Sequence, residues 1–408
     1  MSTCCPKAPA ASVSDVLALM REVCPALEPE QVSLADACGR VLREPVCAPE
    51  DQPRFDRSSV DGYAVRLDDR ASRFRIVDEI RAGEWKPRAL QLGEAMRIAT
   101  GGALPGDRLQ VVMKEDVRAE GRQLTVLRRE DEHNIRFRGE DAPAGRVLIE
   151  AGTVLQAGGL ALLASLGCAR PLVTRQPRVL HLATGNEIVS PDRRPARGQI
   201  RDSNSTLVRA FFGQWGIAPE QARVGEDKAA IEAALAEGHS RMGGCDLVLI
   251  SGGASVGEHD FTRALLHESS FVIHVSKTNA RPGRPLIVAQ RGDTLALGLP
   301  GNPLAHFVCL NLYVRAALEA FSAQSARTGF VTGVLSAQLP AGGNTRETFW
   351  PARWSMHEGL ATLMPLRWIS SGDLTPLAAA NALIRVAAGA EQLQPGSRVE
   401  FIRTERTS

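Results

Sequence analysis

Hydrophobic runs alternate with amphipathic helical stretches between residues 178 and 321. In one such stretch Leu207, Phe211 and Trp215 share a helical face, and Gly216 stands where a helix C-cap belongs. This βαβ alternation predicts a three-layer α/β domain, with helices on both faces of a mostly parallel sheet. The predicted strands include Val179 to Ala183, Leu247 to Ile250, Val272 to Val275, Leu286 to Ala289 and Thr294 to Leu297.

The rest of the chain follows other patterns. An amphipathic segment behind Ser12 or Ser14 predicts a capped helix that ends at Pro25. Short β-like runs punctuated by Pro and Gly from Glu50 to about Gly145 indicate a β-rich insertion, and period-two strands from Phe330 onward indicate a C-terminal β-barrel-like domain. The predicted domains are an elongated, discontinuous linker domain (1–50 and 143–177), the insertion (51–142), the α/β domain (178–327) and the C-terminal β domain (328–408).

Composition narrows the class of protein. The 408 residues carry 48 Lys and Arg against 46 Asp and Glu, and this net charge of +2 argues against nucleic acid or an anionic membrane as a partner. The eight cysteines form no Cys-x-x-Cys pair, so we expect reduced thiols rather than a zinc or redox site. Neither a signal peptide nor a run of about 18 apolar residues is evident, so we expect a cytoplasmic protein.

Polar, glycine-rich segments follow four strands of the predicted α/β domain. Ligands of open α/β sheets bind at the carboxyl ends of the strands, because loops and helix N-termini converge there. We therefore expect the site at this edge. The segments are Thr184 to Glu187, Glu226-Asp227, Ser251 to Asp260 and Leu299 to Pro303.

The segment after Leu247 to Ile250 has the clearest chemistry. Ser251, Gly252 and Gly253 allow backbone N–H groups to approach a phosphate or another oxyanion, and the helix that begins near Asp260 adds its positive end. We interpret this segment as an anion-binding loop, with a flexible βα turn as the alternative. Gly253 to Gly257 also matches the nucleophile elbow of serine hydrolases, but Ser255 lies several residues past the strand, which argues against that function.

Charged residues of both signs gather at these strand ends. Glu187, Asp227 and Asp260 come from three of them and together predict a Mg²⁺ site beside a phosphate, although each acid alone is more typical of a helix cap or a solvated loop. Lys277, Arg281 and Arg284 flank a Pro-Gly pair next to the proposed anion loop, and Lys277 is one of only five lysines. We favour a functional cationic cluster over a solvated basic face.

Eight separated motifs in order along nearly the whole chain resemble the molybdopterin molybdotransferase family, which includes MoeA and the C-terminal domain of gephyrin. Most of these motifs are weak evidence when taken one at a time, but the match of all eight together is highly specific. The motifs are Ser58 to Ala64, Ile98 to Gly101, Arg138 to Asp141, Thr184 to Glu187, Asp202 to Ser205, Ser251 to Asp260, Leu299 to Pro303 and Ser370 to Asp373.

The resemblance implies a four-domain homodimer that inserts molybdate into adenylylated molybdopterin with Mg²⁺ and releases AMP. Other cofactor-biosynthesis proteins are candidate partners. By resemblance Asp61 and Thr100, with Asp141 nearby, reach the cleft from the β-rich insertion of the partner subunit. The other implied site residues are the acids Glu187, Asp227 and Asp260 as catalytic groups and metal ligands, the anion loop Ser251, Gly252 and Gly253, the cations Lys277, Arg281 and Arg284, the pocket prolines Pro300 and Pro303, and Arg346 and Ser371 from the C-terminal domain.

The chain departs from the family pattern at several positions. Asn186 stands where Asp is common, and Arg281 and Arg284 replace lysines, which keeps the charge and changes the geometry. Leu304-Ala305 replaces the usual Val-Ser and removes a hydroxyl. Two further functions stay open: a non-catalytic scaffold that holds the pterin, and an adenylyltransferase, which would need only the α/β domain.

Overall fold

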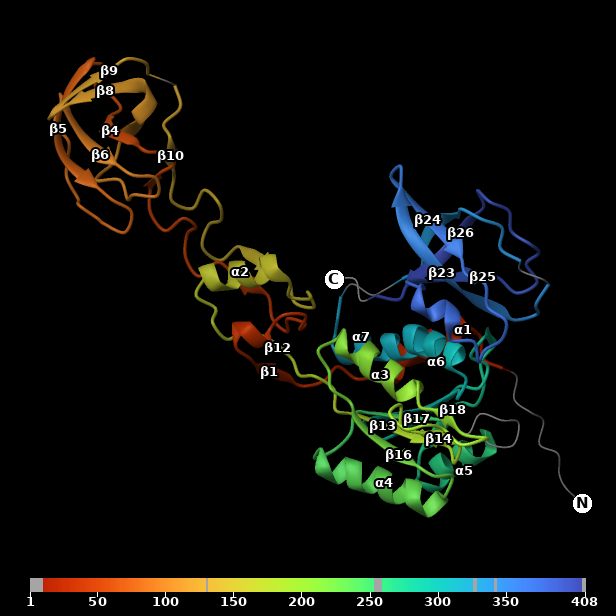
Figure 1. Ribbon diagram of the computed structural model, residues 1–408. Helices are drawn as coiled ribbons and strands as arrows, with labels where there is room; N and C mark the ends of the chain where they lie inside the picture. The colour runs from red at the N-terminus through yellow and green to blue at the C-terminus, as the bar shows by residue number, and fades with distance from the viewer. Residues whose placement is uncertain (1–9, 130, 253–258, 326–328, 341–342, 406–408) are drawn as a thin grey trace, which may run out of the picture. The chain divides into compact units, whose positions relative to one another are not determined.

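The computed structural model describes residues 10–129, 131–252, 259–325, 329–340 and 343–405. By their internal contacts the residues divide into two compact units (Figure 1). We call Met1–Glu44, Ala151–Ala161 and Ala169–Ser408 the first unit, and Pro45–Glu150 with Leu162–Cys168 the second unit.

The second unit is built around a six-stranded sheet in the order β7-β4-β6-β5-β9-β8. Only the β5–β6 pairing is parallel. Apolar side chains are buried on both faces of this sheet, as the β-rich pattern predicts. Its strands are β4 (Gly62–Arg66), β5 (Arg73–Ile80), β6 (Glu94–Ile98), β7 (Leu109–Met113), β8 (Val117–Glu120) and β9 (Gln123–Val126), and short ladders join β2 (Val46–Cys47) to β11 (Val147–Ile149) and β3 (Arg57–Ser58) to β10 (Ile135–Arg136).

The first unit contains the predicted α/β sheet, in the order β16-β13-β17-β21-β20-β18. The first four strands are parallel, whereas β20 and β18 join antiparallel. Only Gly292 and Asp293 separate β20 from β21, and two residues can close a hairpin but cannot cross back over a sheet. The strands are β13 (Val179–Thr184), β16 (Glu220–Val224), β17 (Leu247–Ser251), β18 (Val272–Val275), β20 (Ile287–Arg291) and β21 (Thr294–Leu299).

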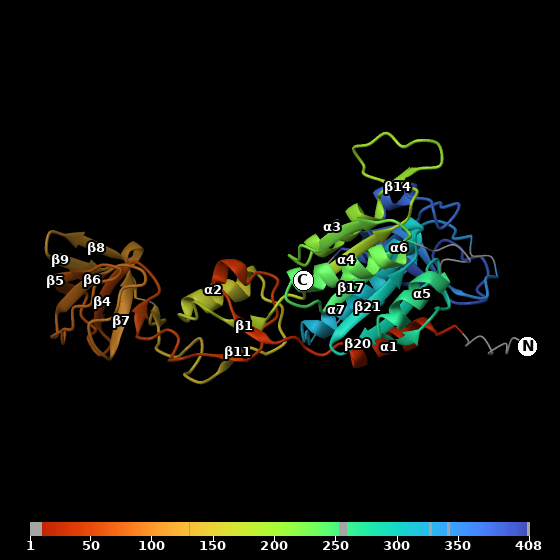
Figure 2. The same ribbon diagram turned by 90° about the horizontal axis from the view of Figure 1, so that it is seen from below.

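Helices cover both faces of this sheet, which confirms the three-layer prediction. Alternate residues of a strand point to opposite faces. Leu247 and Leu249 of β17 join a cluster with α3 and α6–α7, while Val248 and Ile250 join a second cluster with α4 and α5 (Figure 1). β17 runs beside β21 and β21 beside β20 (Figure 2). The helices are α3 (Asn204–Gly213), α4 (Lys228–Arg241), α5 (His259–Glu268), α6 (Pro303–Cys309) and α7 (Arg315–Phe321).

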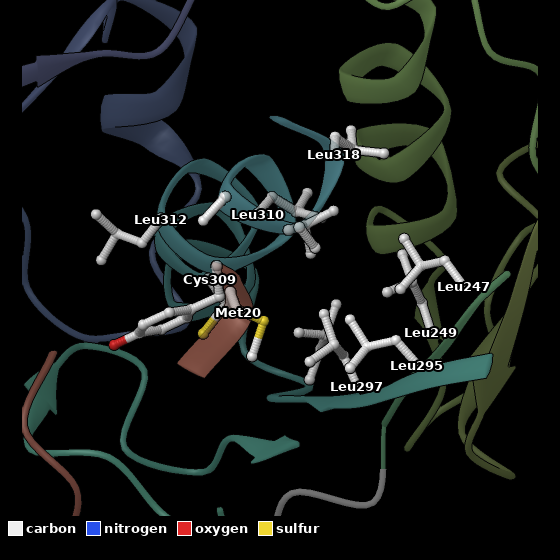
Figure 3. Packing of buried hydrophobic residues seen from close by; sticks show 14 of the residues in the cluster. Met20, Leu247, Leu249, Leu295, Leu297, Cys309, Leu310, Leu312 and Leu318 are labelled. Atoms are coloured by element: carbon white, nitrogen blue, oxygen red, sulfur yellow. The ribbon is translucent and has the colours of Figure 1, made fainter. Parts of the chain in front are cut away.

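One long apolar helix runs through the larger cluster. α6 and α7 are joined by the π-helical segment Leu310–Val314, so helix continues from Pro303 to Phe321. Its 19 residues are long and apolar enough to span a membrane. However, 89% of an apolar stretch of 18 residues within this helix is buried inside the protein, as in the core helix of a globular protein. Figure 3 shows Cys309, Leu310 and Leu318 of this helix facing Leu249 and Leu297 of the sheet.

The N-terminal helix α1 (Val13–Val23) packs into the same cluster. Ser12 caps it by accepting a hydrogen bond from the N–H of Asp15, as the sequence predicts. Met20 is fully buried beside Cys309 (Figure 3). The predicted domain boundaries stay predictions. The remaining small elements of this unit are β1 (Pro29–Gln31), η1 (Leu34–Asp36), β12 (Leu172–Thr174), β14 (Ile188–Val189) and β15 (Ile200–Arg201). The residues of α2 (Ala157–Ser165) are divided between the two units after Ala161.

The C-terminal part of the first unit is a closed five-stranded barrel, which confirms the predicted β-barrel-like domain. Its strands follow the order β23-β24-β22-β26-β25, and a β23–β25 pairing closes the ring. Phe401 and Leu363 lie in its core. The strands are β22 (Val331–Leu335), β23 (Glu347–His357), β24 (Leu360–Pro365), β25 (Ala382–Val386) and β26 (Arg398–Arg403), and β19 (Ala280–Arg281) adds to β23 from the α/β side.

Candidate functional site

A cavity of about 230 Å³ lies where the α/β sheet of the first unit meets the barrel. It brings together five residues that the family resemblance implies: Arg281, Arg284, Pro300, Arg346 and Ser371. They come from four separate segments of the chain. The structure therefore brings these residues, which are far apart in the chain, to one cavity, and their roles stay predictions.

The β19–β23 pairing explains why two of the arginines meet. Ala280 pairs with Glu347 and Arg281 with Thr348 in parallel register. Arg346, directly before β23, is therefore brought beside the segment that carries Arg281 and Arg284. Gly283 between them has φ +118°, and a Cβ there would lie 3.2 Å from Cys309 Sγ, so the turn needs glycine.

The cavity concentrates positive charge. Burial and the charges of Arg284 and Arg281 lower the pKa of the half-buried Arg346 guanidinium. None of the three guanidinium groups forms an ion pair with an acid in the part of the chain that the structure describes. Arg281 instead lies over the ring of Trp368, at 5.3 Å from its centroid. Clustered, uncompensated guanidinium groups are suited to an oxyanion.

Ser371 presents a hydroxyl to the same cavity. Asn302 Nδ2 donates to Ser371 Oγ at 2.9 Å, and the N–H of Leu304 donates to the Ser371 carbonyl at 3.0 Å. Ser371 Oγ accepts that bond, so its own hydrogen remains free to donate to a ligand. The N-terminus of α6, where Asn302 and Ala305 line the cavity, adds partial positive charge.

Sequence reasoning missed some lining residues and included others that do not line the cavity. Trp368 lines it and was not predicted, although it is one of only five tryptophans. Asn302 also lines it; it belongs to the predicted segment Leu299 to Pro303 but was not singled out as a site residue. Pro303 instead forms the first turn of α6, and Lys277 lies in the loop before β19, where its carbonyl accepts from the N–H of Ala11. Ala305, which replaces the serine of the family pattern, presents only a methyl group to the cavity. A hydroxyl is provided by Ser371 instead.

The carboxyl end of β17 forms a second, buried polar group of residues. Ser251 is buried, and its hydroxyl hydrogen-bonds His181 Nε2 on β13. Gly252 has φ +117°, and a Cβ there would lie 1.9 Å from the carbonyl oxygen of Thr184, so only glycine fits. Gly253 and Ser255 lie outside the described residues.

Two buried histidines support the strand-end loops. His306 Nδ1 hydrogen-bonds the Pro300 carbonyl at 3.1 Å, and its ring centroid lies 6.4 Å from that of His181. Burial lowers the pKa of His306 to about 4, and burial together with His306 lowers the pKa of His181 to about 3. Both imidazoles are therefore neutral at pH 7 and act as hydrogen-bonding supports.

The three acids predicted to line the cleft lie at the ends of different strands or helices. Glu187 is exposed beyond β13. Asp227 is the N-cap of α4, where its Oδ1 accepts from the N–H of Ala230 at 2.8 Å. Asp260 lies in the first turn of α5, but its side chain is outside the described residues. Among the described residues, no group of three His, Cys, Asp or Glu could hold a metal ion.

The second unit holds the other predicted catalytic residues. Asp61 Oδ1 accepts from the N–H and the hydroxyl of Thr100, each at 2.8 Å. Asp61 Oδ2 accepts from Lys114 Nζ at 3.1 Å, a contact that sequence reasoning missed. Asp141 is exposed and pairs with Arg136. The structure thus joins Asp61 to Thr100 and adds Lys114.

Comparison with known proteins identifies the family. Residues 11–167 match the MoeA N-terminal region (domain I and II), residues 181–320 a probable molybdopterin binding domain, and residues 332–403 the MoeA C-terminal region (domain IV). The chain belongs to the molybdopterin molybdenumtransferase family. Members of this family are transferases of molybdenum-cofactor biosynthesis, which confirms the family and the enzyme class expected from the motifs.

Individual members are similar to this chain over more than nine-tenths of their length. The molybdopterin molybdenumtransferase of Bacillus subtilis is 33% identical and covers 93% of this chain and 91% of its own. The molybdopterin molybdenumtransferase of Nostoc sp. is also 33% identical, and the match covers 97% of this chain and 94% of the Nostoc protein. A crystal structure of the molybdopterin biosynthesis MoeA protein from Pyrococcus horikosii has a TM-score of 0.81 at 26% identity and covers 98% and 100%. The MoeA fold expected from the sequence is therefore confirmed.

Proposed function

We propose that this chain inserts molybdate into adenylylated molybdopterin, in a Mg²⁺-dependent reaction that releases AMP. The arginine-lined cavity carries the proposal within this family. Molybdate and the phosphoanhydride are both anionic, so bringing them together requires cations fixed in advance. Arg281, Arg284 and Arg346 supply them, and none of the three forms an ion pair with an acid in the described part of the chain.

Each cavity group has a distinct task in this proposal. The guanidinium groups bind the tetrahedral oxyanion and offset its charge. The Ser371 hydroxyl, held by Asn302, donates to one of its oxygens and orients it. Trp368 holds Arg281 by its ring face. These residues bind and position the reactants, so the reaction needs no covalent nucleophile.

The strand-end acids fit Mg²⁺ in their chemistry. Glu187 and Asp227 are exposed carboxylates, and Mg²⁺ prefers one or two carboxylates together with water and substrate phosphate. Asp227 has one oxygen engaged by the N–H of Ala230 and one remaining for a ligand. When bound, Mg²⁺ would polarise the phosphoryl oxygens. We propose Asp260 as the third acid, together with the anion loop of Ser251, Gly252 and Gly253.

The test is an assay of the purified chain with adenylylated pterin, molybdate and Mg²⁺. We expect AMP and molybdenum cofactor to form together and only when molybdate is present. Binding of the pterin without AMP release would support the scaffold function instead. Consumption of ATP with unmodified pterin would support the adenylyltransferase function.

We further propose a cytoplasmic homodimer in which Asp61 and Thr100 act in the partner's cleft. Asp61 and Thr100 belong to the second unit, whereas the residues of the arginine cavity belong to the first, which fits this assignment. Mixed dimers of Asp61→Ala and Asp260→Ala chains should recover part of the activity, since one complete cleft then forms. No recovery from two folded variants would place both residues in one subunit's site.

A further inference from the structure

Three side chains converge at one end of three neighbouring strands in the second unit. Asp61 directly precedes β4, Lys114 directly follows β7, and Thr100 lies two residues after β6. Antiparallel pairing of Gly62 with Met113 and with Ile98 sets these strand ends side by side. The sheet therefore fixes the relative positions of residues that are up to 53 apart in the chain.

The Asp61 carboxylate is largely occupied by this arrangement. Oδ1 accepts two hydrogen bonds from Thr100, and Oδ2 accepts one from Lys114 Nζ. These bonds, the Thr100 N–H foremost, hold the pKa of Asp61 well below its usual range. A carboxylate oxygen accepts about two hydrogen bonds, so only Oδ2 has a free position. Asp61 is thus a charged anchor with little capacity for a further ligand.

Lys114 is the group with donors to spare. The Thr100 hydroxyl directs its one hydrogen at Asp61, so toward a ligand it can only accept. The Lys114 ammonium has three hydrogens, one of which is used by Asp61, and its side chain is 57% exposed. Within the described residues, its Nζ has no second hydrogen-bond acceptor. The ammonium is therefore fixed in position while still able to bind an anion.

We propose that Lys114 is a substrate-binding residue that holds an anionic oxygen, and that Asp61 is a positioning residue that aims it. The proposal rests on the proposed function. Its two reactants both carry anionic oxygens, which belong to the phosphoanhydride in adenylylated molybdopterin and to the oxyanion itself in molybdate. Thr100 completes the arrangement by fixing the Asp61 rotamer. Asp61 then contributes to the reaction through Lys114 rather than by binding the substrate itself.

The experiment compares Lys114→Gln and Lys114→Arg with a matched control, Lys86→Gln. Lys86 lies in the same unit, is 41% exposed, and also meets a carboxylate, with Nζ 3.4 Å from Asp78 Oδ1. Steady-state AMP release is measured while adenylylated pterin and molybdate are varied in turn. We expect Lys114→Gln to raise KM for one of them about tenfold or more, the loss of one charge-assisted hydrogen bond.

The two titrations show which oxyanion Lys114 binds. A raised KM for the pterin identifies its phosphoryl group, and a raised KM for molybdate identifies the metal oxyanion. Lys114→Arg keeps the charge and should restore most of the affinity. Lys86→Gln should leave both KM values unchanged. Thermal melts of the three variants should coincide with that of wild type, because all the substitutions are exposed.

A double variant tests whether Asp61 acts through Lys114. If it does, Asp61→Asn should cost little more in the Lys114→Gln background than Lys114→Gln costs alone. If the double variant instead shows the product of the two single-variant losses in activity, Asp61 makes a separate contact, and its positioning role is overturned. Lys114→Gln with the kinetics of Lys86→Gln, in an active wild-type enzyme, would overturn the proposal and leave the proposed function standing. An inactive wild type would overturn both.

Discussion

Replacing Arg346 by Met should weaken oxyanion binding without weakening the fold. Methionine retains an apolar stem of similar length, so packing against the cavity wall is largely preserved. The change removes one of the three guanidinium groups that make the cavity electropositive. Burial and the charges of the other two, Arg284 and Arg281, lower the pKa of Arg346. The change therefore also removes repulsion that the folded protein bears.

These two effects set the expected magnitudes. Loss of one charged hydrogen-bond partner of an oxyanion should raise KM for molybdate by about 10- to 100-fold. Relief of repulsion from Arg281 and Arg284, screened by solvent, should leave the free energy of unfolding unchanged or raise it by up to about 1 kcal/mol. A binding loss without a stability loss is typical of a functional cluster of like charges.

The assay is AMP release at varied molybdate, with a denaturant melt of the same preparation. Arg353→Met is the control, because Arg353 is exposed on β23, the strand that follows Arg346. Arg346→Met with the molybdate KM of the control would refute the assignment of the cavity to the oxyanion. A large fall in stability would refute the reasoning that Arg346 is held against repulsion.

Three further outcomes are expected. Asp260→Asn should slow AMP release about a hundredfold, while the pterin still binds and stability falls by less than about 1 kcal/mol. Wild-type turnover in a folded variant would limit this acid to stabilising the first turn of α5. Ser255→Ala should keep near-wild-type activity, and labelling of Ser255 by a fluorophosphonate would contradict this. The neutral His306 imidazole stabilises the fold fully above the unfolded-state pKa of 6.5, and this contribution is lost as pH falls toward its folded pKa of about 4. Urea melts from pH 7 to 4 should thus show a decline that is shallower for His306→Gln by about 1.4 kcal/mol per pH unit, and parallel declines would exclude His306 as a source.

The layered fold was predictable because burial leaves a clear periodic signal. Leu247–Ile250 is apolar on both faces, and helices do cover both. The antiparallel β20–β21 hairpin departs from the predicted βαβ pattern, because the two-residue turn at Gly292 is too short for a crossover between parallel strands.

The site was predictable where a motif names residues and not where only tertiary contacts do. The family resemblance implied Arg281, Arg346 and Ser371 as residues of one site, and the three line one cavity. Trp368 and Lys114 belong to no motif, and their roles arise from a cation–π contact and a strand-end hydrogen bond between distant segments. Contacts of this kind leave no local pattern in the chain, although both residues are of rare types here.

The most direct test of the central claim is anomalous diffraction from crystals soaked in molybdate. The account predicts a molybdenum peak inside the arginine cavity, within hydrogen-bond reach of Arg281, Arg346 and Ser371, which disappears in the Arg346→Met variant. A molybdenum peak at the Ser251-Gly252 loop, or in the cavity of Arg346→Met at unchanged occupancy, would contradict it.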